Sequence, residues 1–197
     1  MALSPESLLD VFRQTGAYLK GHFRLTSGLH SPEYLQCALV LQHPNHAETC
    51  GRELAAAIAL AAGTSAVDVV VSPAMGGLII GHEVARAFGV RHIFTERDTD
   101  RKMTLRRGFT LKPGERAVVV EDVITTGGST LEVVELLKAA GVEVLGAGSV
   151  IDRSGGRANV SVPRAALATL QVTTYDPAEC PLCQQGLPVV KPGSRPS

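Results

Sequence analysis

Several features are missing from this 197-residue chain, and each absence excludes a class of protein. The chain has 19 Lys plus Arg and 19 Asp plus Glu, so its formal net charge is zero and it has no net positive charge to attract nucleic acid. The longest apolar run, residues 54–62, is about half of the roughly 20 residues that span a bilayer. Residues 1–10 place an acidic residue where a secretory signal needs basic ones. We therefore expect a cytoplasmic protein that binds neither nucleic acid nor a membrane.

Cysteine is also scarce, with only four residues in the chain. In a cytosolic protein we expect reduced thiols, and the apolar surroundings of Cys37 and Cys50 are typical of buried ones. Cys180 and Cys183 form a CxxC pair, which can hold half of a zinc site or act as a redox pair. The chain has no second CxxC and no His-x-x-x-His. The sequence therefore favours no protein-bound metal, and leaves the role of this pair open.

The two common nucleotide-binding motifs are absent as well. The chain has no P-loop lysine and no GxGxxG spacing. Residues 118–130 show a different pattern, in which a β-branched apolar run meets two acids and then a turn of Thr, Gly and Ser. Such a run is typical of a strand buried on both faces of a parallel sheet, and residues 129–140 have helical periodicity. The turn therefore follows the carboxyl end of a strand and precedes a helix.

Anion binding is expected at this turn. A phosphate there would meet free N–H groups and the positive end of the helix dipole, and Gly127 and Gly128 let the backbone approach closely. Glu121 and Asp122 point to opposite sides of the strand, so one can hold a ribose hydroxyl or a metal-bound water. An ordinary helix cap also uses Ser, Thr and Gly, but it does not require adjacent acids. The pattern predicts a sugar-phosphate cradle at residues 125–129.

Strand and helix patterns alternate along most of the chain, which predicts an α/β fold with a mostly parallel central sheet flanked by helices. Strands are expected at 67–71, 90–95, 117–121 and 142–151, and helices at 44–63, up to 88, and 129–140. Before them, a first helix capped by Ser4 and two short strands, 23–28 and 34–40, predict a small N-terminal lobe. The expected divisions are 1–43 for this lobe, 44–175 for the core, and 176–197 for a C-terminal segment that packs near the lobe and ends in a frayed tail.

Two other strand ends carry candidate binding residues. Residues 72–77 offer backbone N–H groups to a second anion, although any tight strand-to-helix turn can use Pro and Gly. Asp152 and Arg153 end a buried strand, and the guanidinium of Arg153 suits a planar carboxylate on a substrate. The alternative is an ion pair between Arg153 and Asp152 or a neighbouring acid.

A charged segment, residues 96–108, carries five cations and three acids. It is too long for a simple turn, so it can form a mobile lid that closes over a leaving anion and excludes water. A solvated loop or a charged hairpin fits the same composition nearly as well.

The pattern at 118–130 resembles the phosphoribosyl diphosphate (PRPP) signature of the type I phosphoribosyltransferases. Residues 21–34 resemble the hood of the orotate phosphoribosyltransferase family, and Asp152 with Arg153 resembles its pyrimidine-contacting pair. The resemblance implies transfer of a 5-phosphoribosyl group from PRPP to orotate, with Mg²⁺ carried by PRPP rather than bound directly by the protein, and a homodimer.

The resemblance also assigns roles to residues. It implies that orotate binds to Thr125 and Arg153, that Arg97 and Lys102 of the lid are catalytic, and that a strained or cis peptide joins Ala74 to Met75. The implied pyrophosphate loop is Ala74, Met75 and Gly76. The implied PRPP-binding residues are Glu121, Asp122, Val123, Ile124, Thr125, Thr126, Gly127, Gly128 and Ser129.

The chain departs from the commoner form of the family at several positions. Thr26 replaces the usual lysine of the orotate loop, Met75-Gly76 replaces Tyr-Lys, and the lid begins with Glu96-Arg97 instead of Arg-Lys. Thr125 stands where the hypoxanthine and guanine enzymes carry an Asp. Two alternatives stay open: a phosphoribosyltransferase for another base, best adenine, and a PRPP-sensing regulator that binds nucleic acid.

Overall fold

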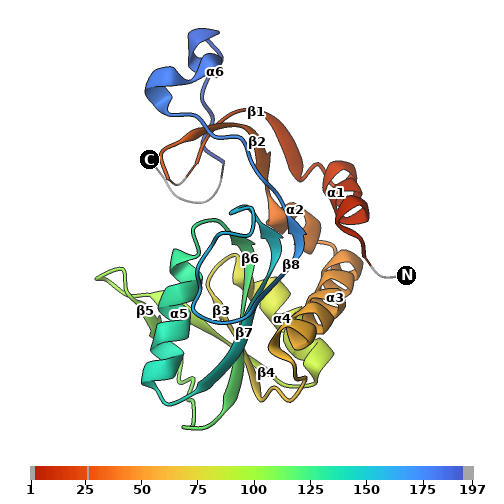
Figure 1. The fold of residues 1–197 in the computed structure, drawn as a ribbon, viewed down its shortest axis with the longest axis vertical. Coiled ribbons are helices and arrows are strands. Elements are labelled where there is room, and N and C mark those ends of the chain that lie inside the picture. Colours follow the sequence, from red (N-terminus) through yellow and green to blue (C-terminus); the bar gives the residue numbers. More distant parts are fainter. Residues whose placement is uncertain (1–2, 26, 193–197) are drawn as a thin grey trace.

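The computed structural model of the protein describes residues 3–25 and 27–192. Predictions on Thr26 and on the tail from residue 193 onward lie outside these residues. A small lobe sits on a larger α/β body, and residues from both ends of the chain lie in the lobe (Figure 1). In the described part of the chain, no helix combines the length and the apolar character needed to cross a bilayer.

The body is built on a six-stranded sheet with the order β5-β4-β3-β6-β7-β8. All neighbouring strands are parallel except β4 and β5, which are antiparallel. This confirms the predicted α/β class with a mostly parallel sheet, although β5 and β8 were not predicted. The strands are β3 (Val69–Pro73), β4 (Arg91–Arg97), β5 (Met103–Leu105), β6 (Arg116–Ile124), β7 (Glu143–Asp152) and β8 (Arg164–Thr169).

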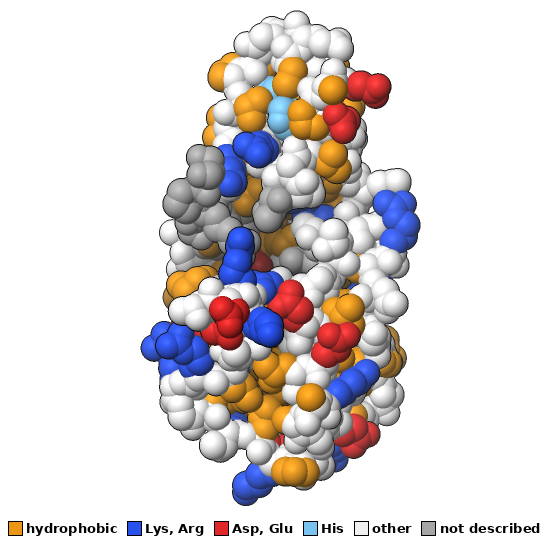
Figure 2. All heavy atoms as spheres, turned by 90° about the vertical axis from the view of Figure 1, so that its left-hand side faces the viewer, with side chains coloured by type: hydrophobic (Ala, Val, Ile, Leu, Met, Phe, Trp, Pro, Cys, Tyr) orange, Lys and Arg blue, Asp and Glu red, His pale blue; other side chains and the backbone are white. Residues whose placement is uncertain are grey.

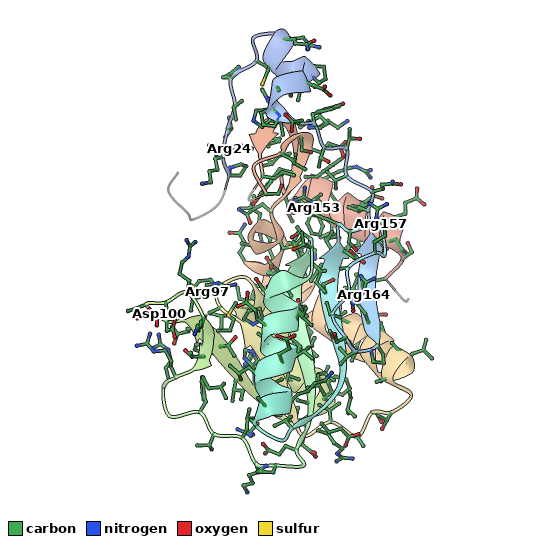
Figure 3. All side chains as sticks on the ribbon, turned by 60° about the vertical axis from the view of Figure 1, so that its left-hand side comes forward. Arg24, Arg97, Asp100, Arg153, Arg157 and Arg164 are labelled. Atoms are coloured by element: carbon green, nitrogen blue, oxygen red, sulfur yellow. The ribbon has the colours of Figure 1, made fainter. Side chains whose placement is uncertain are left out.

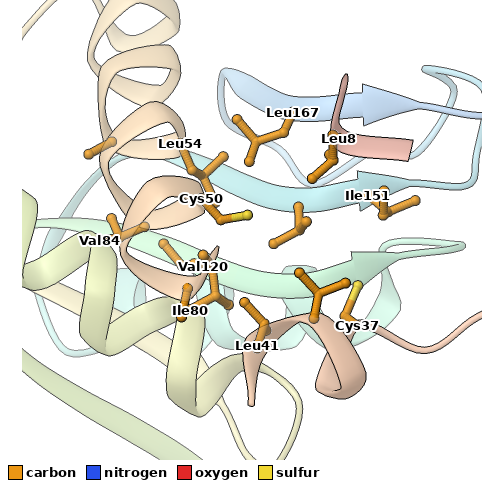
Figure 4. Close-up of a cluster of buried hydrophobic side chains, with 14 of the residues drawn as sticks. Leu8, Cys37, Leu41, Cys50, Leu54, Ile80, Val84, Val120, Ile151 and Leu167 are labelled. Carbon is orange, nitrogen blue, oxygen red and sulfur yellow. The ribbon is translucent and has the colours of Figure 1, made fainter. Parts of the chain in front are cut away.

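Helices cover both faces of this sheet. On β6, Val118 and Val120 belong to one apolar cluster and Val119 to the other, because successive strand residues face opposite sides. The first cluster contains residues of α3 (Pro44–Ala62) and α4 (Gly77–Phe88), which meet Val120 in the core (Figure 4). The second contains residues of α5 (Gly128–Ala139). The uninterrupted apolar run in β6 is therefore explained by burial on two sides.

The small lobe contains α1 (Pro5–Gln14), β1 (Tyr18–Arg24), β2 (His30–Leu35) and α2 (Cys37–Leu41). Ser4 caps α1 as predicted, since its hydroxyl accepts a hydrogen bond from the N–H of Ser7 at 3.2 Å. The prediction of a strand over 34–40 was wrong beyond residue 35. Residues 37–41 form a short helix whose apolar side chains enter the main core, and a short apolar run does not distinguish helix from strand.

The C-terminal residues lie against the β1–β2 hairpin. After β8 the chain forms a 3₁₀ turn, η1 (Pro177–Glu179), and a single helical turn, α6 (Pro181–Gln184). Tyr175 exchanges backbone hydrogen bonds with His30 at 2.8 and 2.9 Å, and Val190 bonds to both His22 and Arg24 at 2.8 Å. Residues from opposite ends of the chain thus complete the lobe that overhangs the carboxyl ends of the strands.

Candidate active site

The residues of the predicted cradle, 125–129, lie between the end of β6 and the start of α5, which confirms the predicted strand–turn–helix order. Gly127 has a φ of 86°, in the left-handed region that favours glycine, and caps the helix. The first helical hydrogen bond runs from the N–H of Leu131 to the carbonyl of Gly127 at 2.8 Å. The N–H groups of residues 128–130 therefore lack acceptors within the helix, and the N–H of Gly128 makes only a long bond of 3.4 Å to Oγ1 of Thr126. These donors face an anion at the positive end of the helix dipole.

A hollow of about 70 Å³ lies within this turn. All the predicted PRPP-binding residues except Asp122 line it, and Thr130, which the sequence analysis did not single out, lines it too. The turn is tightly packed from behind: a Cβ added to Gly127 would lie 3.1 Å from Cγ1 of Val160 and 3.3 Å from Cβ of Ala158. The backbone donors are thus held in place before any ligand binds.

The two acids face different sides, as their positions on a strand predict. Glu121 lines the hollow, and burial, followed by the charge of Asp122, raises the pKa of its carboxyl well above the usual value. Asp122 turns toward the pyrophosphate loop, because a Cβ added to Gly76 would lie 2.4 Å from its Oδ1. A glycine at position 76 is therefore required for the loop to approach this carboxylate.

The pyrophosphate loop connects β3 to α4 directly beside the cradle. The N–H of Ala74 donates to the carbonyl of Thr95 at 2.8 Å, and the peptide bond between Ala74 and Met75 is cis, as the resemblance implies. The side chain of Met75 is exposed. Because β3 and β6 are neighbouring parallel strands, both turns open at the same edge of the sheet, which is where α/β proteins bind ligands.

Arg153 reaches this edge from the end of β7. Its backbone N–H donates to the carbonyl of Ile124 at 2.8 Å, which holds the backbone of Arg153 beside the end of β6. Its Nε is buried without a hydrogen-bond partner among the described residues, and burial lowers the pKa of its guanidinium. Figure 3 shows Arg153 where the lobe meets the body.

The predicted alternative, an ion pair between Arg153 and Asp152, was wrong. Asp152 is almost fully buried and bonds instead to the guanidinium of Arg164 and to Ser154, whose N–H and hydroxyl donate at 2.7 and 2.6 Å. Burial alone would raise the pKa of Asp152, but these bonds outweigh it and lower the pKa. The Asp152 carboxylate therefore does not satisfy the buried Nε of Arg153.

The hood contributes a residue to which the sequence analysis gave no role. Tyr34 on β2 is partly buried, and burial raises the pKa of its phenol while the charge of Arg153 opposes the shift. The thiol of Cys37, on α2, lies 3.7 Å from the carbonyl of Asp122, so α2 of the lobe contacts β6. The surface is hollowed where lobe and body meet (Figure 2). Tyr34 thus borders the space in front of Arg153.

The charged segment at 96–108 begins as a hairpin of β4 and β5, the second of the predicted alternatives. Arg97 donates to both carboxylate oxygens of Glu132 on α5, at 2.9 and 3.1 Å, and the side chain of Lys102 is exposed. An open hollow of about 370 Å³ lies between the hairpin and α5. Of these two hollows, only the smaller one in the turn after β6 is lined by a helix N-terminus, the feature that favours anions.

Comparison with known proteins agrees with this geometry. Residues 40–164 match the family model described as a phosphoribosyl transferase domain. Orotate phosphoribosyltransferases of Desulforamulus reducens and Pelotomaculum thermopropionicum are 55% and 54% identical to this chain, in alignments covering 98% of it and 98% and 99% of theirs. The solved orotate phosphoribosyltransferase from Aeropyrum pernix has a TM-score of 0.68 at 26% identity, covering 83% of this chain and 94% of that one. The chain therefore belongs to the orotate phosphoribosyltransferase family.

Proposed function

We propose that this protein transfers the 5-phosphoribosyl group of PRPP to orotate, which gives orotidine 5′-monophosphate and pyrophosphate. The observation that carries the proposal is the buried, unpartnered Nε of Arg153 beside a cradle of free N–H groups. A buried donor without a partner is costly unless a ligand satisfies it, and the orotate carboxylate would do so. The names of the nearly full-length relatives support the same reaction.

The cradle holds the 5-phosphate of PRPP. Backbone donors at residues 128–130 and the dipole of α5 stabilise its charge, while Glu121, which lines the hollow, accepts a hydrogen bond from a ribose hydroxyl. Asp122, which faces residues 74–76, offers a carboxylate that fits Mg²⁺ or its bound water. When it is bound with PRPP, Mg²⁺ supplies positive charge next to the diphosphate.

Orotate lies between Arg153 and the hood. Its carboxylate pairs with Arg153, and the Thr125 hydroxyl bonds to an edge of the ring without acting as a base. Orotate reacts through N1 after loss of its ring proton, so a catalytic carboxylate at position 125 is unnecessary. Adenine has no carboxylate and would leave the guanidinium of Arg153 unpaired, which favours orotate over adenine.

The displacement at C1 of the ribose needs positioning and charge stabilisation. The carbon bond to N1 of orotate forms as the bond to the pyrophosphate oxygen breaks, and the leaving electron pair stays on pyrophosphate. Residues 74–76 receive that anion, and Arg97 and Lys102 approach it from the hairpin. Arg97 must exchange its pairing with Glu132 for this contact. We further infer a cytoplasmic homodimer, for which the family resemblance is the support.

Loss of orotate absorbance in the presence of PRPP and Mg²⁺ tests the reaction. Arg153→Ala should raise the KM for orotate by roughly 10- to 100-fold, the loss expected for charged hydrogen bonds of about 1.5–3 kcal/mol, and leave the KM for PRPP nearly unchanged. Arg157→Ala is the matched control, because Arg157 is exposed in the same loop and its removal changes the charge equally.

Three outcomes distinguish the candidate functions. Orotate-dependent release of pyrophosphate supports the proposal, and adenine-dependent release would replace orotate by adenine as the substrate. Binding of RNA or DNA that depends on PRPP, without turnover of either base, would identify a regulator. An unchanged orotate KM in Arg153→Ala would remove Arg153 from the site.

A further inference from the structure

Four side chains capable of binding a metal converge at the far end of the hood, away from the cradle. They are His22 on β1, His30 on β2, and the pair Cys180 and Cys183 at the start of α6. One ligand atom from each lies within 4.8 Å of all the others. In the described part of the chain this is the one group of three or more side chains placed to bind a metal ion. None of the four residues takes part in the reaction proposed above.

The distances within the cluster fit one tetrahedral ion. Nε2 of His22 lies 3.6 Å from Sγ of Cys180 and 3.7 Å from Sγ of Cys183, and Nδ1 of His30 lies 3.3 Å from Sγ of Cys183. Zn–S bonds of about 2.3 Å and Zn–N bonds of about 2.0 Å require nitrogen–sulfur separations of about 3.5 Å in a tetrahedron. The two ring nitrogens are 2.9 Å apart and need to separate by only about 0.4 Å.

The orientation of His22 also suits a ligand. Its Nδ1 lies 2.8 Å from the carbonyl of Leu187, an acceptor that requires the proton on Nδ1. The lone pair of Nε2 is then directed at the cluster. A backbone carbonyl that fixes the tautomer of a histidine in this way is the usual outer partner of a metal-bound imidazole. His22, His30 and Cys180 are all buried.

The surrounding chain has few other means of stability. An isolated two-stranded hairpin is marginal in water. Up to residue 192, the C-terminal segment adds only a three-residue 3₁₀ turn, a four-residue helix and isolated bridges. Small units without a core of their own are commonly held together by a metal or by disulfides. A metal bound by all four side chains would join β1, β2 and α6 directly.

The geometry points to a structural Zn²⁺ site formed by His22, His30, Cys180 and Cys183, which fastens the C-terminal segment to the hood. The ligand set of two thiolates and two imidazoles is one that Zn²⁺ prefers, and four protein ligands leave no open position for catalysis. Because both cysteines bind as thiolates and both imidazoles as neutral rings, binding releases the two thiol protons to solvent. The site is independent of the proposed transferase reaction.

Metal analysis of tag-free protein tests the proposal. Elemental analysis should find about one zinc per chain. After removal of zinc with a chelator under reducing conditions, Co²⁺ should give the visible bands of a tetrahedral ion together with thiolate-to-cobalt charge transfer. Amide hydrogen exchange at Arg24 and Val190, whose N–H groups join the two segments, should become at least about tenfold faster in the zinc-free protein, while the α3 amides stay protected.

The variant Cys180→Ser/Cys183→Ser should lose zinc. The control is His43→Ala/His46→Ala, which removes another pair of neighbouring histidines, with ring centroids 5.7 Å apart, and should retain it. Co²⁺ titration of the unaltered protein keeps the test valid if the cysteine variant misfolds. Three results would overturn the proposal: reduced protein that binds neither zinc nor Co²⁺, zinc retained by the cysteine variant, or a Cys180–Cys183 disulfide in protein purified without oxygen.

Discussion

Replacing Gly127 by alanine should weaken PRPP binding by displacing the cradle. The backbone of Gly127 lies in the left-handed region, with φ of 86°. An added Cβ would also lie 3.1 Å from Val160 and 3.3 Å from Ala158, closer than side chains normally pack. Either the turn or the packed residues behind it must move, and the turn carries the N–H groups of residues 128–130. Strain at position 127 should therefore displace the backbone donors and weaken phosphate binding.

The magnitude follows from the backbone conformation. A residue other than glycine in the left-handed region costs about 1–2 kcal/mol. If the turn relaxes and binding restores it, the KM for PRPP should rise by roughly 5- to 30-fold, since 1.4 kcal/mol is a factor of ten. If the turn does not relax, the cost appears in folding, and the Tm should fall by roughly 2–8 °C for a chain of this size.

Steady-state kinetics and thermal unfolding separate these effects when Gly63→Ala is the control. Gly63 has a φ of 69° at the end of α3, and no atom lies within 4 Å of the Cβ that alanine would add. It should lose stability by a similar amount with normal kinetics. The reasoning would be refuted if Gly127→Ala kept both the wild-type Tm and the wild-type KM for PRPP.

Three further perturbations test other parts of the structure. Lys102→Ala should lower kcat by roughly 10²–10³-fold in the orotate assay, because it removes a cation from the leaving pyrophosphate. Arg164→Ala should lower the free energy of unfolding in urea by about 3–5 kcal/mol, because it leaves the buried Asp152 carboxylate without its guanidinium. Burial, with a contribution from His82, lowers the pKa of His92 from 6.5 to about 4. The unfolded chain thus binds more protons between these pH values, stability falls as the pH drops through that window, and His92→Gln should reduce the fall measured by urea unfolding.

Each of these three predictions would be contradicted by a specific result. Lys112 is exposed on the body outside the hairpin, so Lys112→Ala should keep the wild-type kcat, and an equal kcat for Lys102→Ala would remove Lys102 from the mechanism. An unchanged urea midpoint in Arg164→Ala would show that the hydrogen bonds from Ser154 suffice for Asp152. Parallel stability curves for His92→Gln and wild type would mean that His92 is not the group that titrates.

Local patterns in the sequence predicted the elements with strong periodicity and clear end signals. The helix ending at Gly63 and the strand leading into Glu121 agree with the structure, because a capping glycine and a doubly buried apolar run have one usual meaning. The strand predicted over 34–40 was wrong at 37–41, because five apolar residues fit either a strand or a helix. Packing into the main core favours the helix there. The strand β8 was missed because no helix precedes it to complete the alternating pattern.

The strand, turn and helix around residues 125–129 could be predicted from sequence alone, because the strand, acids, glycines and helix are consecutive and their geometry is local. The sequence also placed Arg153 at a strand end, but only the tertiary structure showed that Asp152 is taken by Arg164 and that Arg153 keeps a buried donor for a ligand. Likewise, the sequence showed the Cys180–Cys183 pair but not the two further metal ligands that would complete a site. Folding brings His22 and His30 to it from the other end of the chain, and contacts between residues so far apart leave no periodic or spacing signal in the sequence.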